Sequence, residues 1–224
     1  MPLKELRGIV IHWTANTARG ADADAHQRYF NTTTRMASAH YVVDDQQVIQ
    51  LIPDTEVAYH VGDRKRGNIA YPRRAQLLRD AHDPGSQVPN LYTIGVELCV
   101  NQYSDFMRTA EYAAQLTAML LKRHQLTIAD LYRHVDLTGK DCPNMYLNHQ
   151  VAGESYDWSW QTFLALVDVT QERMQLSEQQ KALNDRLYEL MSNTNPPTPN
   201  PTPDPPLTAW DHLALFFVKI FEKK

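Results

Sequence analysis

The sequence predicts an α/β fold in which a C-terminal helical extension follows a central sheet flanked by helices. Residues 8–13 and 93–100 are apolar, β-branched runs typical of buried strands. Residues 109–124 place apolar side chains at helical spacing, an acidic first turn indicates a helix over residues 22–30, and another helix begins at residue 160. Strands and helices mixed in this order favour layers packed around one sheet, which we assign to residues 1–168.

Between these elements, the sequence predicts a hairpin and a long excursion. Two short strands, residues 40–43 and 47–52, flank a polar turn, and Pro53 follows the second strand. Residues 63–89 are polar, rich in arginine and interrupted by three prolines. This stretch is longer than most connecting segments, which favours a function or a mobile surface excursion.

The last quarter of the chain changes character, and we divide it into three segments. Within residues 169–194 an apolar side chain recurs every seven residues, at Val169, Leu176, Leu183 and Leu190. This spacing is compatible with a short coiled coil that makes oligomers, or with one long helix laid on its own domain. Residues 195–206 are rich in proline and predict a polyproline II linker. Residues 207–224 are apolar but too short to span a bilayer, and we expect an interfacial helix or a docking peptide.

The composition indicates which binding partners to expect and in which compartment the protein is made. A net charge of −4 gives no reason to expect nucleic acid, and two cysteines are too few for a disulfide framework. The N-terminus lacks the apolar region of a signal peptide, and no segment reaches the ~18–20 apolar residues needed to cross a bilayer. We therefore expect a soluble chain made in the cytoplasm, whose action outside the cell needs a release route that the sequence does not encode.

Three side chains form a candidate zinc site. His12 lies near the end of the first apolar strand, and we expect His134 and Cys142 on or beside one loop. Neutral imidazole and thiolate are ligands that Zn²⁺ prefers, and three protein ligands plus water is the arrangement of a catalytic site. The alternative is a Cys99–Cys142 disulfide, which would consume the thiolate.

The surrounding segments carry a resemblance to a known family. In order along the chain, these are IVIHWTA at residues 9–15, AHYVV at 39–43, VAYHVG at 57–62, NLYTIGVE at 90–97 and HVDLTGKDCP at 134–143. They resemble the zinc N-acetylmuramoyl-L-alanine amidases of the amidase-2 type, whose fold is shared with peptidoglycan recognition proteins and phage endolysins. The resemblance covers roughly residues 3–167 and implies a central mixed sheet with helices packed around it.

The resemblance implies a role for each matching residue. His12, His134 and Cys142 bind Zn²⁺, and the amide bond between N-acetylmuramic acid and L-alanine in peptidoglycan is cleaved. Glu97 takes a proton from water, a role that also fits a carboxylate placed inside an apolar strand, which is costly without a task or a partner. Lys140 stabilises the oxyanion.

Other matches are weaker. His60 and Asn90 match positions that line the substrate groove in relatives, and the alternative for Asn90 is that its short side chain builds the turn before the strand. Trp13 either lines the groove or packs in the core. In one branch of the family a tyrosine precedes the histidine at position 40, whereas this chain has Ala39 there, so a catalytic role for Tyr41 is doubtful. The chain instead resembles the endolysin-like branch, which carries glutamate at the position of Glu97.

The remaining histidines and Cys99 lack such a context. We interpret Cys99 as an inert buried thiol and the histidines as surface or packing residues: His26, His82, His124, His149 and His212. The arginines of the long excursion are either a solvated loop or a contact for stem-peptide carboxylates and anionic wall polymers: Arg64, Arg66, Arg73, Arg74 and Arg79.

The sequence therefore predicts a zinc hydrolase of peptidoglycan, from a phage, a prophage or a bacterium that remodels its wall. The alternative is a non-catalytic peptidoglycan-binding module of the same fold, or a scaffold whose C-terminal part carries the main task. Binding-only relatives tend to lose the thiolate ligand, which Cys142 retains. The C-terminal helices are compatible with oligomer formation or contact with a membrane surface.

Overall fold

A computed structural model describes residues 1–3, 5–61, 88–148, 150–151, 154–155 and 159–194. Contacts divide the chain into two compact units, Met1–Gln171 and Glu172–Lys224. The predicted linker and apolar terminal segment lie outside the described residues, as do residues 63–87 of the arginine-rich stretch. The domain boundaries drawn from the sequence stay predictions.

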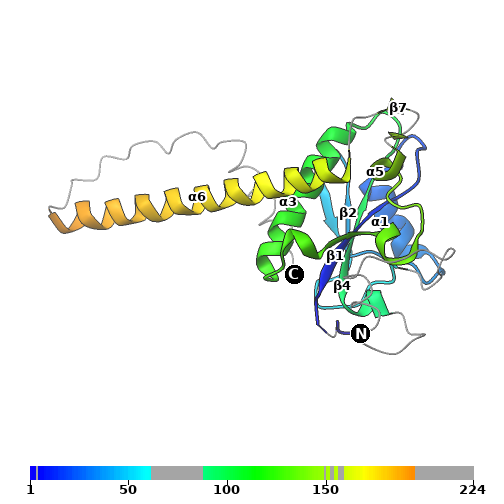
Figure 1. The fold of residues 1–224 in the computed structure, drawn as a ribbon, viewed down its shortest axis with the longest axis horizontal. Coiled ribbons are helices and arrows are strands. Elements are labelled where there is room, and N and C mark those ends of the chain that lie inside the picture. The colour runs from blue at the N-terminus through cyan, green and yellow to red at the C-terminus, as the bar shows by residue number, and fades with distance from the viewer. Residues whose placement is uncertain (4, 62–87, 149, 152–153, 156–158, 195–224) are drawn as a thin grey trace. The chain divides into compact units, whose positions relative to one another are not determined.

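A five-stranded mixed sheet forms the centre of the first unit (Figure 1). Its strand order is β3-β2-β4-β1-β5, with β1 at Gly8–Trp13, β2 at Tyr41–Val43, β3 at Val48–Gln50, β4 at Thr93–Leu98 and β5 at Leu131–Arg133. The pairs β2–β4, β4–β1 and β1–β5 are parallel, and β2–β3 is the predicted antiparallel hairpin. The central strands are almost wholly buried, which explains their continuous apolar runs. The predicted α/β class with a central mixed sheet is confirmed.

Two long helices pack against this sheet. Helix α1 (Ala23–Thr32) contacts β2 and β3, and helix α3 (Phe106–Arg123) contacts β2, β3 and β4. Side chains immediately before each helix cap it, Asp22 accepting from the amide of Ala25 and Asp105 from that of Arg108. Helix α3 begins at Phe106, three residues before the predicted residue 109. The prediction used only the spacing of apolar residues, which does not reveal that Asp105 caps the helix.

Shorter elements complete the first unit. These are α4 (His134–Thr138) and α5 (Met145–Asn148), the 3₁₀ helices η1 (Val88–Leu91) and η2 (Ile128–Asp130), and the two-stranded sheet of β6 (Gln150–Val151) and β7 (Glu154–Ser155). His134 thus begins a short helix directly after β5, in a region that the sequence predicted to lie on or beside a loop.

Helix α6 runs without interruption from Trp160 to Thr194 and crosses the border between the two units. Its early turns bury Phe163 and Val167, whereas Leu176 and Leu183 are 64% and 53% exposed. Both sequence interpretations require a helix here, and the choice between coiled coil and docked helix stays a prediction. Within the described ranges, no helix has the length and apolar character that a membrane span requires.

Strand register places the chemistry of the candidate site. In the parallel pair β1–β4, His12 lies directly opposite Glu97. Because side chains alternate along a strand, these two point to the same face of the sheet. Val42 of β2 lies opposite Glu97 on that face, and Tyr41 therefore points to the other face.

Candidate metal centre

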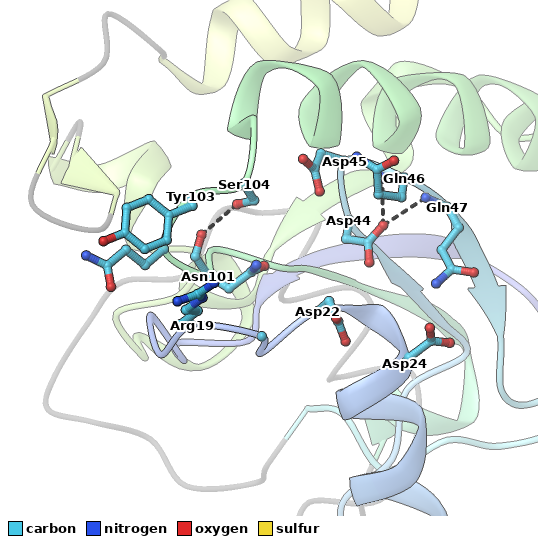
Figure 2. Close-up of a pocket in the computed structure, with 12 residues that line it drawn as sticks. Arg19, Asp22, Asp24, Asp44, Asp45, Gln46, Gln47, Asn101, Tyr103 and Ser104 are labelled. Atoms are coloured by element: carbon cyan, nitrogen blue, oxygen red, sulfur yellow. Dashed lines mark hydrogen bonds between the residues drawn. The ribbon is translucent and has the colours of Figure 1, made fainter.

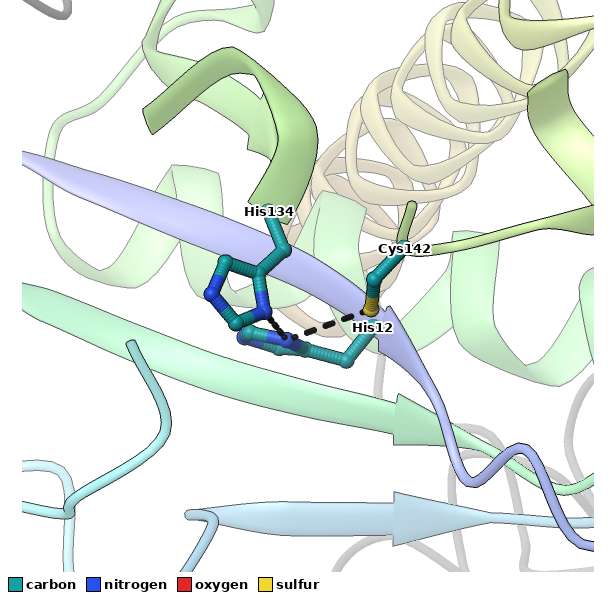
Figure 3. Close-up of side chains that lie close together, drawn as sticks. All are labelled: His12, His134 and Cys142. Atoms are coloured by element: carbon teal, nitrogen blue, oxygen red, sulfur yellow. Dashed lines mark hydrogen bonds between the residues drawn. The ribbon is translucent and has the colours of Figure 1, made fainter. Parts of the chain in front are cut away.

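The three predicted ligands converge, although they come from distant parts of the chain (Figure 3). Nδ1 of His12 lies 3.0 Å from Nδ1 of His134 and 3.7 Å from Sγ of Cys142. All three side chains are buried, and their ligand atoms lie within 4.8 Å of one another. Cys142 reaches this position because the loop after α4 folds back, its carbonyl accepting from the amide of Val135.

This donor set fits a zinc ion. With Zn–N near 2.05 Å and Zn–S near 2.3 Å, tetrahedral coordination places two nitrogens about 3.3 Å apart and a nitrogen and sulfur about 3.6 Å apart. The observed separations of 3.0 and 3.7 Å are close to these values. Both cysteines are free, so the alternative disulfide does not form.

The protonation of the ligands follows from their burial. Burial lowers the pKa of His12, with a further contribution from neighbouring histidines, and lowers the pKa of His134 to about 3, with help from the charge of Lys140. Both imidazoles are therefore neutral, as metal ligands need to be. Burial raises the pKa of Cys142 to about 12, aided by the charge of Glu97 and opposed by a hydrogen bond from the Trp13 backbone. The thiol accordingly keeps its proton until a cation displaces it.

Glu97 lies beside His12 and has a carboxylate oxygen without a hydrogen-bond partner among the described residues. This oxygen, Oε2, is buried. Burial raises the pKa of Glu97 to about 8, while the positive charge of Lys140 opposes the rise. Lys140 itself is exposed, and its positive charge acts on His12 and His134 as well as on Glu97. An enclosed carboxylate oxygen without a partner is costly, which is typical of a group that interacts with substrate or water.

His60 and Asn90 lie close to the centre and make contacts inside the protein. Nδ1 of His60 lies 2.9 Å from Nε2 of His12. Asn90 is buried and accepts through Oδ1 from the amides of His60 and Val61, at 3.1 and 2.8 Å. Both side chains therefore make hydrogen bonds within the site. Direct contact of either residue with substrate stays a prediction.

The predictions for Trp13 and Tyr41 have different outcomes in space. Trp13 follows His12 in β1, so its side chain points to the face of the sheet opposite that of His12. Its backbone amide donates a hydrogen bond to the sulfur of Cys142. Its role in lining the groove stays a prediction. The hydroxyl of Tyr41 donates to Asp54 at 2.5 Å on the face away from the ligands, which agrees with the doubt about a catalytic role.

Two residues that support the site were not anticipated, Thr93 and Gly95 of β4. A Cβ atom built on Gly95 would lie 2.5 Å from Cγ of His60, so only glycine leaves room for that ring. Thr93 offers its carbonyl to Nε2 of His60 at 3.2 Å. A glycine inside an apolar strand often marks such a close approach, which is the signal the sequence contained.

The remaining candidates are structural or lie outside the described residues. Cys99 packs with Ala23 and Val42, and burial raises the pKa of its thiol strongly. His26 hydrogen-bonds the carbonyl of Asp22, and His124 pairs with Asp54. Several candidates are not among the described residues: His82, His149, His212 and the arginines at 64, 66, 73, 74 and 79.

A separate cavity of about 680 Å³ lies beside the start of α1, the β2–β3 turn and the residues after β4 (Figure 2). None of the three ligands lines it, although four aspartates do: Asp22, Asp24, Asp44 and Asp45. Asp44 accepts from the amides of Ala23, Gln46 and Gln47. Asp22 caps α1 and Asp45 accepts from the amide of Asp105, so three of the four carboxylates serve backbone donors, and we assign the cavity no ligand.

The sheet and the His-His-Cys cluster define an α/β protein with a buried site that fits zinc. Residues 2–145 match the model of the Amidase_2 family, described as N-acetylmuramoyl-L-alanine amidase. The chain belongs to this family, and the family resemblance predicted from the sequence is confirmed.

Individual relatives agree with this assignment. The chain is 36% identical over 154 residues to a probable N-acetylmuramoyl-L-alanine amidase of Bacillus licheniformis, covering 66% of this chain and 39% of the relative. It is 33% identical over 140 residues to the N-acetylmuramoyl-L-alanine amidase XlyA of Bacillus subtilis (strain 168), covering 62% and 40%. The chain therefore spans about two fifths of the length of these curated relatives.

Solved structures show the same fold. A mutant endolysin from Bacillus subtilis superposes with a TM-score of 0.57 at 30% identity, covering 73% of this chain and 86% of that structure. The catalytic domain of XlyA superposes with a TM-score of 0.56 at 30% identity, covering 72% and 86%. The matched region thus covers most of each solved structure but less than half the length of each full-length relative.

Proposed function

We propose that this protein is a zinc-dependent amidase that hydrolyses the bond between N-acetylmuramic acid and the first L-alanine of the peptidoglycan stem peptide. The observation that carries the proposal is the convergence of His12, His134 and Cys142, with Glu97 on the same face of the sheet. The names of the relatives, which include endolysins and N-acetylmuramoyl-L-alanine amidases, support the choice of bond.

Each residue near the centre has a role in this reaction. When bound to the three ligands, zinc supplies Lewis-acid chemistry that activates water at neutral pH and polarises an amide carbonyl. The free Oε2 of Glu97 accepts the proton of the attacking water and passes it to the departing amine of L-alanine. The ammonium of Lys140, whose charge acts on Glu97 and both histidines, stabilises the negative charge that develops on the carbonyl oxygen.

The alternative function is a peptidoglycan-binding module without catalysis. Two observations favour the enzyme. The thiolate ligand Cys142 is retained in the cluster, and a binding module has no use for an enclosed Glu97 oxygen that lacks a partner.

Product analysis of purified peptidoglycan tests both possibilities. We expect mass spectrometry to show stem peptides with a free L-alanine amino group and muramic acid with a free lactyl carboxylate. A chelator should abolish both products, and added zinc should restore them. Cleavage of another bond, or undiminished cleavage in the chelator, would contradict the proposal. Binding to the wall without any product would favour the non-catalytic module.

We propose an accessory role for the second unit, through oligomer formation at the heptad positions or contact with a membrane surface. The exposed Leu176 and Leu183 support this role, because they are not needed for the core of the first unit. Deleting the residues after 171 tests it. Loss of wall lysis with retained cleavage of soluble muramyl peptides would show that the unit delivers the enzyme, whereas unchanged lysis would show that it is dispensable.

A further inference from the structure

Four buried histidine rings form a row across one face of the sheet. Following the contacts, the order is His134, His12, His60 and His40, with centroid separations of 4.7, 5.1 and 5.6 Å. Only the first two are in the metal cluster. His60 comes from the segment before the long excursion and lies between a ligand and the backbone of β4.

The acceptors around His60 determine which of its nitrogens carries a proton. Its Nε2 lies 3.2 Å from the carbonyl oxygen of Thr93, which can only accept. It also lies 3.3 Å from Oγ1 of Thr93, whose own hydroxyl proton is donated to the carbonyl of Pro89 at 2.6 Å. Both neighbours require that Nε2 of His60 donates, so a neutral ring presents a lone pair at Nδ1.

The tautomer of His60 determines the tautomer of His12. The lone pair on Nδ1 of His60 lies 2.9 Å from Nε2 of His12, which must then carry a proton and donate it. A neutral imidazole has one proton, so Nδ1 of His12 is unprotonated. That nitrogen is the atom that lies near both His134 and Cys142.

The pose of His60 is held from three sides. Its ring lies against Gly95, where a Cβ atom would collide with it. Its backbone amide is bound by Asn90, whose side chain also donates to the carbonyl of Val61 at 3.0 Å. At the far end of the row, Nδ1 of His40 accepts from the amide of Gly95 at 3.0 Å, while Nε2 donates to the carbonyl of Glu56 at 2.9 Å. A ring anchored this firmly is suited to orient its neighbour.

We propose that His60 is a positioning residue of the metal centre, which accepts the Nε2 proton of His12 and so keeps Nδ1 of His12 free and aimed at the cation. The inference rests on the zinc site of the proposed function but does not require the amidase reaction. Partners that orient a metal-bound histidine typically contribute a 10- to 100-fold effect on metal affinity.

Zinc affinity in matched variants tests the inference. His60→Leu removes the acceptor but keeps an apolar side chain of moderate size, and we expect zinc affinity to fall about 10- to 100-fold in a chelator competition assay. His60→Asn places an amide oxygen near the position of Nδ1, and we expect affinity to return to within a few-fold of the parent. Equal affinity in parent and His60→Leu, with only KM raised, would overturn the inference and assign His60 to substrate binding.

The tautomer of His12 gives a second measurement, which needs no substrate and tests the inference on the parent protein alone. In the metal-free parent, ¹⁵N NMR of His12 should show the proton on Nε2, and the His60→Asn variant should show the same. In His60→Leu a mixture of tautomers is expected. A proton on Nδ1 of His12 in the parent would overturn the inference, even if the variants fail to fold.

These results separate the inference from the proposed function. Zinc binding with the expected tautomer but no cleavage of peptidoglycan would sustain the role of His60 and overturn the amidase. A complete lack of zinc binding would overturn both.

Discussion

Two polar clusters on opposite faces of the same sheet differ in how completely their atoms are paired. On one face, Asp54 accepts from Tyr41, Gln50 and Arg123 and pairs with His124, which ties the β2–β3 edge to the end of α3. On the other face, the ligand atoms of His12, His134 and Cys142 lie within 4.8 Å of one another, and an oxygen of Glu97 has no partner among the described residues. A satisfied cluster stabilises the fold, whereas a convergent and unsatisfied one is available for chemistry.

Removing a ligand should have the largest effect on the unsatisfied cluster. Cys142→Ser replaces the soft thiolate by a hydroxyl, so we expect zinc to be lost and the rate to fall by more than about a thousandfold. Metal analysis of freshly purified protein and the rate of wall hydrolysis are the measurements. Cys99→Ser is the matched control and should keep both zinc and rate. Turnover by metal-free Cys142→Ser would contradict the assignment of the site.

Glu97→Gln isolates the proton-transfer role, because it keeps the size of the side chain and removes its basicity. We expect kcat to fall by about 10²–10⁴-fold, while zinc content and substrate affinity stay close to those of the parent. Steady-state kinetics together with metal analysis distinguish these effects. A nearly normal kcat would remove Glu97 from the role of general base.

Lys140→Met tests the positive charge that acts on the cluster. The expected loss is about 2.7–4 kcal/mol of transition-state stabilisation, or roughly 10²–10³ in kcat, with zinc retained. Lys140→Arg preserves the charge and should recover a large part of the rate. If both variants match the parent, the lysine is only a solvated loop residue.

A substitution in the cluster around Asp54 should lower the stability of the fold without changing the metal centre. Burial opposes ionisation of Asp54, but hydrogen bonds from His124, Tyr41 and Arg123 outweigh it and hold its pKa below the ordinary value. Asp54→Asn should therefore lower the free energy of unfolding at neutral pH by about 1–3 kcal/mol. Zinc affinity should not change, and a large loss of zinc would show that the two clusters are not independent.

The pH dependence of this effect has a defined sign. Because the folded pKa of Asp54 is lower than the unfolded one, its contribution is complete above the unfolded value of about 3.9. It is lost as the pH falls through the lower folded value. Urea unfolding of parent and Asp54→Asn should differ most at neutral pH and converge in acid. A difference that persists unchanged below about pH 3 would contradict this account.

Much of the fold and the three members of the candidate metal cluster could be predicted from the sequence. The apolar runs at residues 8–13 and 93–100 predicted two buried strands, which the structure forms as β1 and β4, with β4 ending at Leu98. The motifs around His12, His134 and Cys142 predicted three metal ligands, and the structure brings these side chains together. Helix α4 was not predicted, because five residues are too few to show a helical period. The part played by Thr93 also escaped prediction, since a backbone carbonyl acts there and its side chain carries no signal.

The in-register pairing of His12 with Glu97 has a consequence for how such a site tolerates change. The separation between His12 and Glu97 is set by hydrogen bonds between two adjacent strands, so insertions in the loops between these strands need not disturb it. A slip of one residue between those strands would be far more damaging, because it would carry the carboxylate to the opposite side of the sheet. Loop length is thus free to evolve, whereas strand alignment is not.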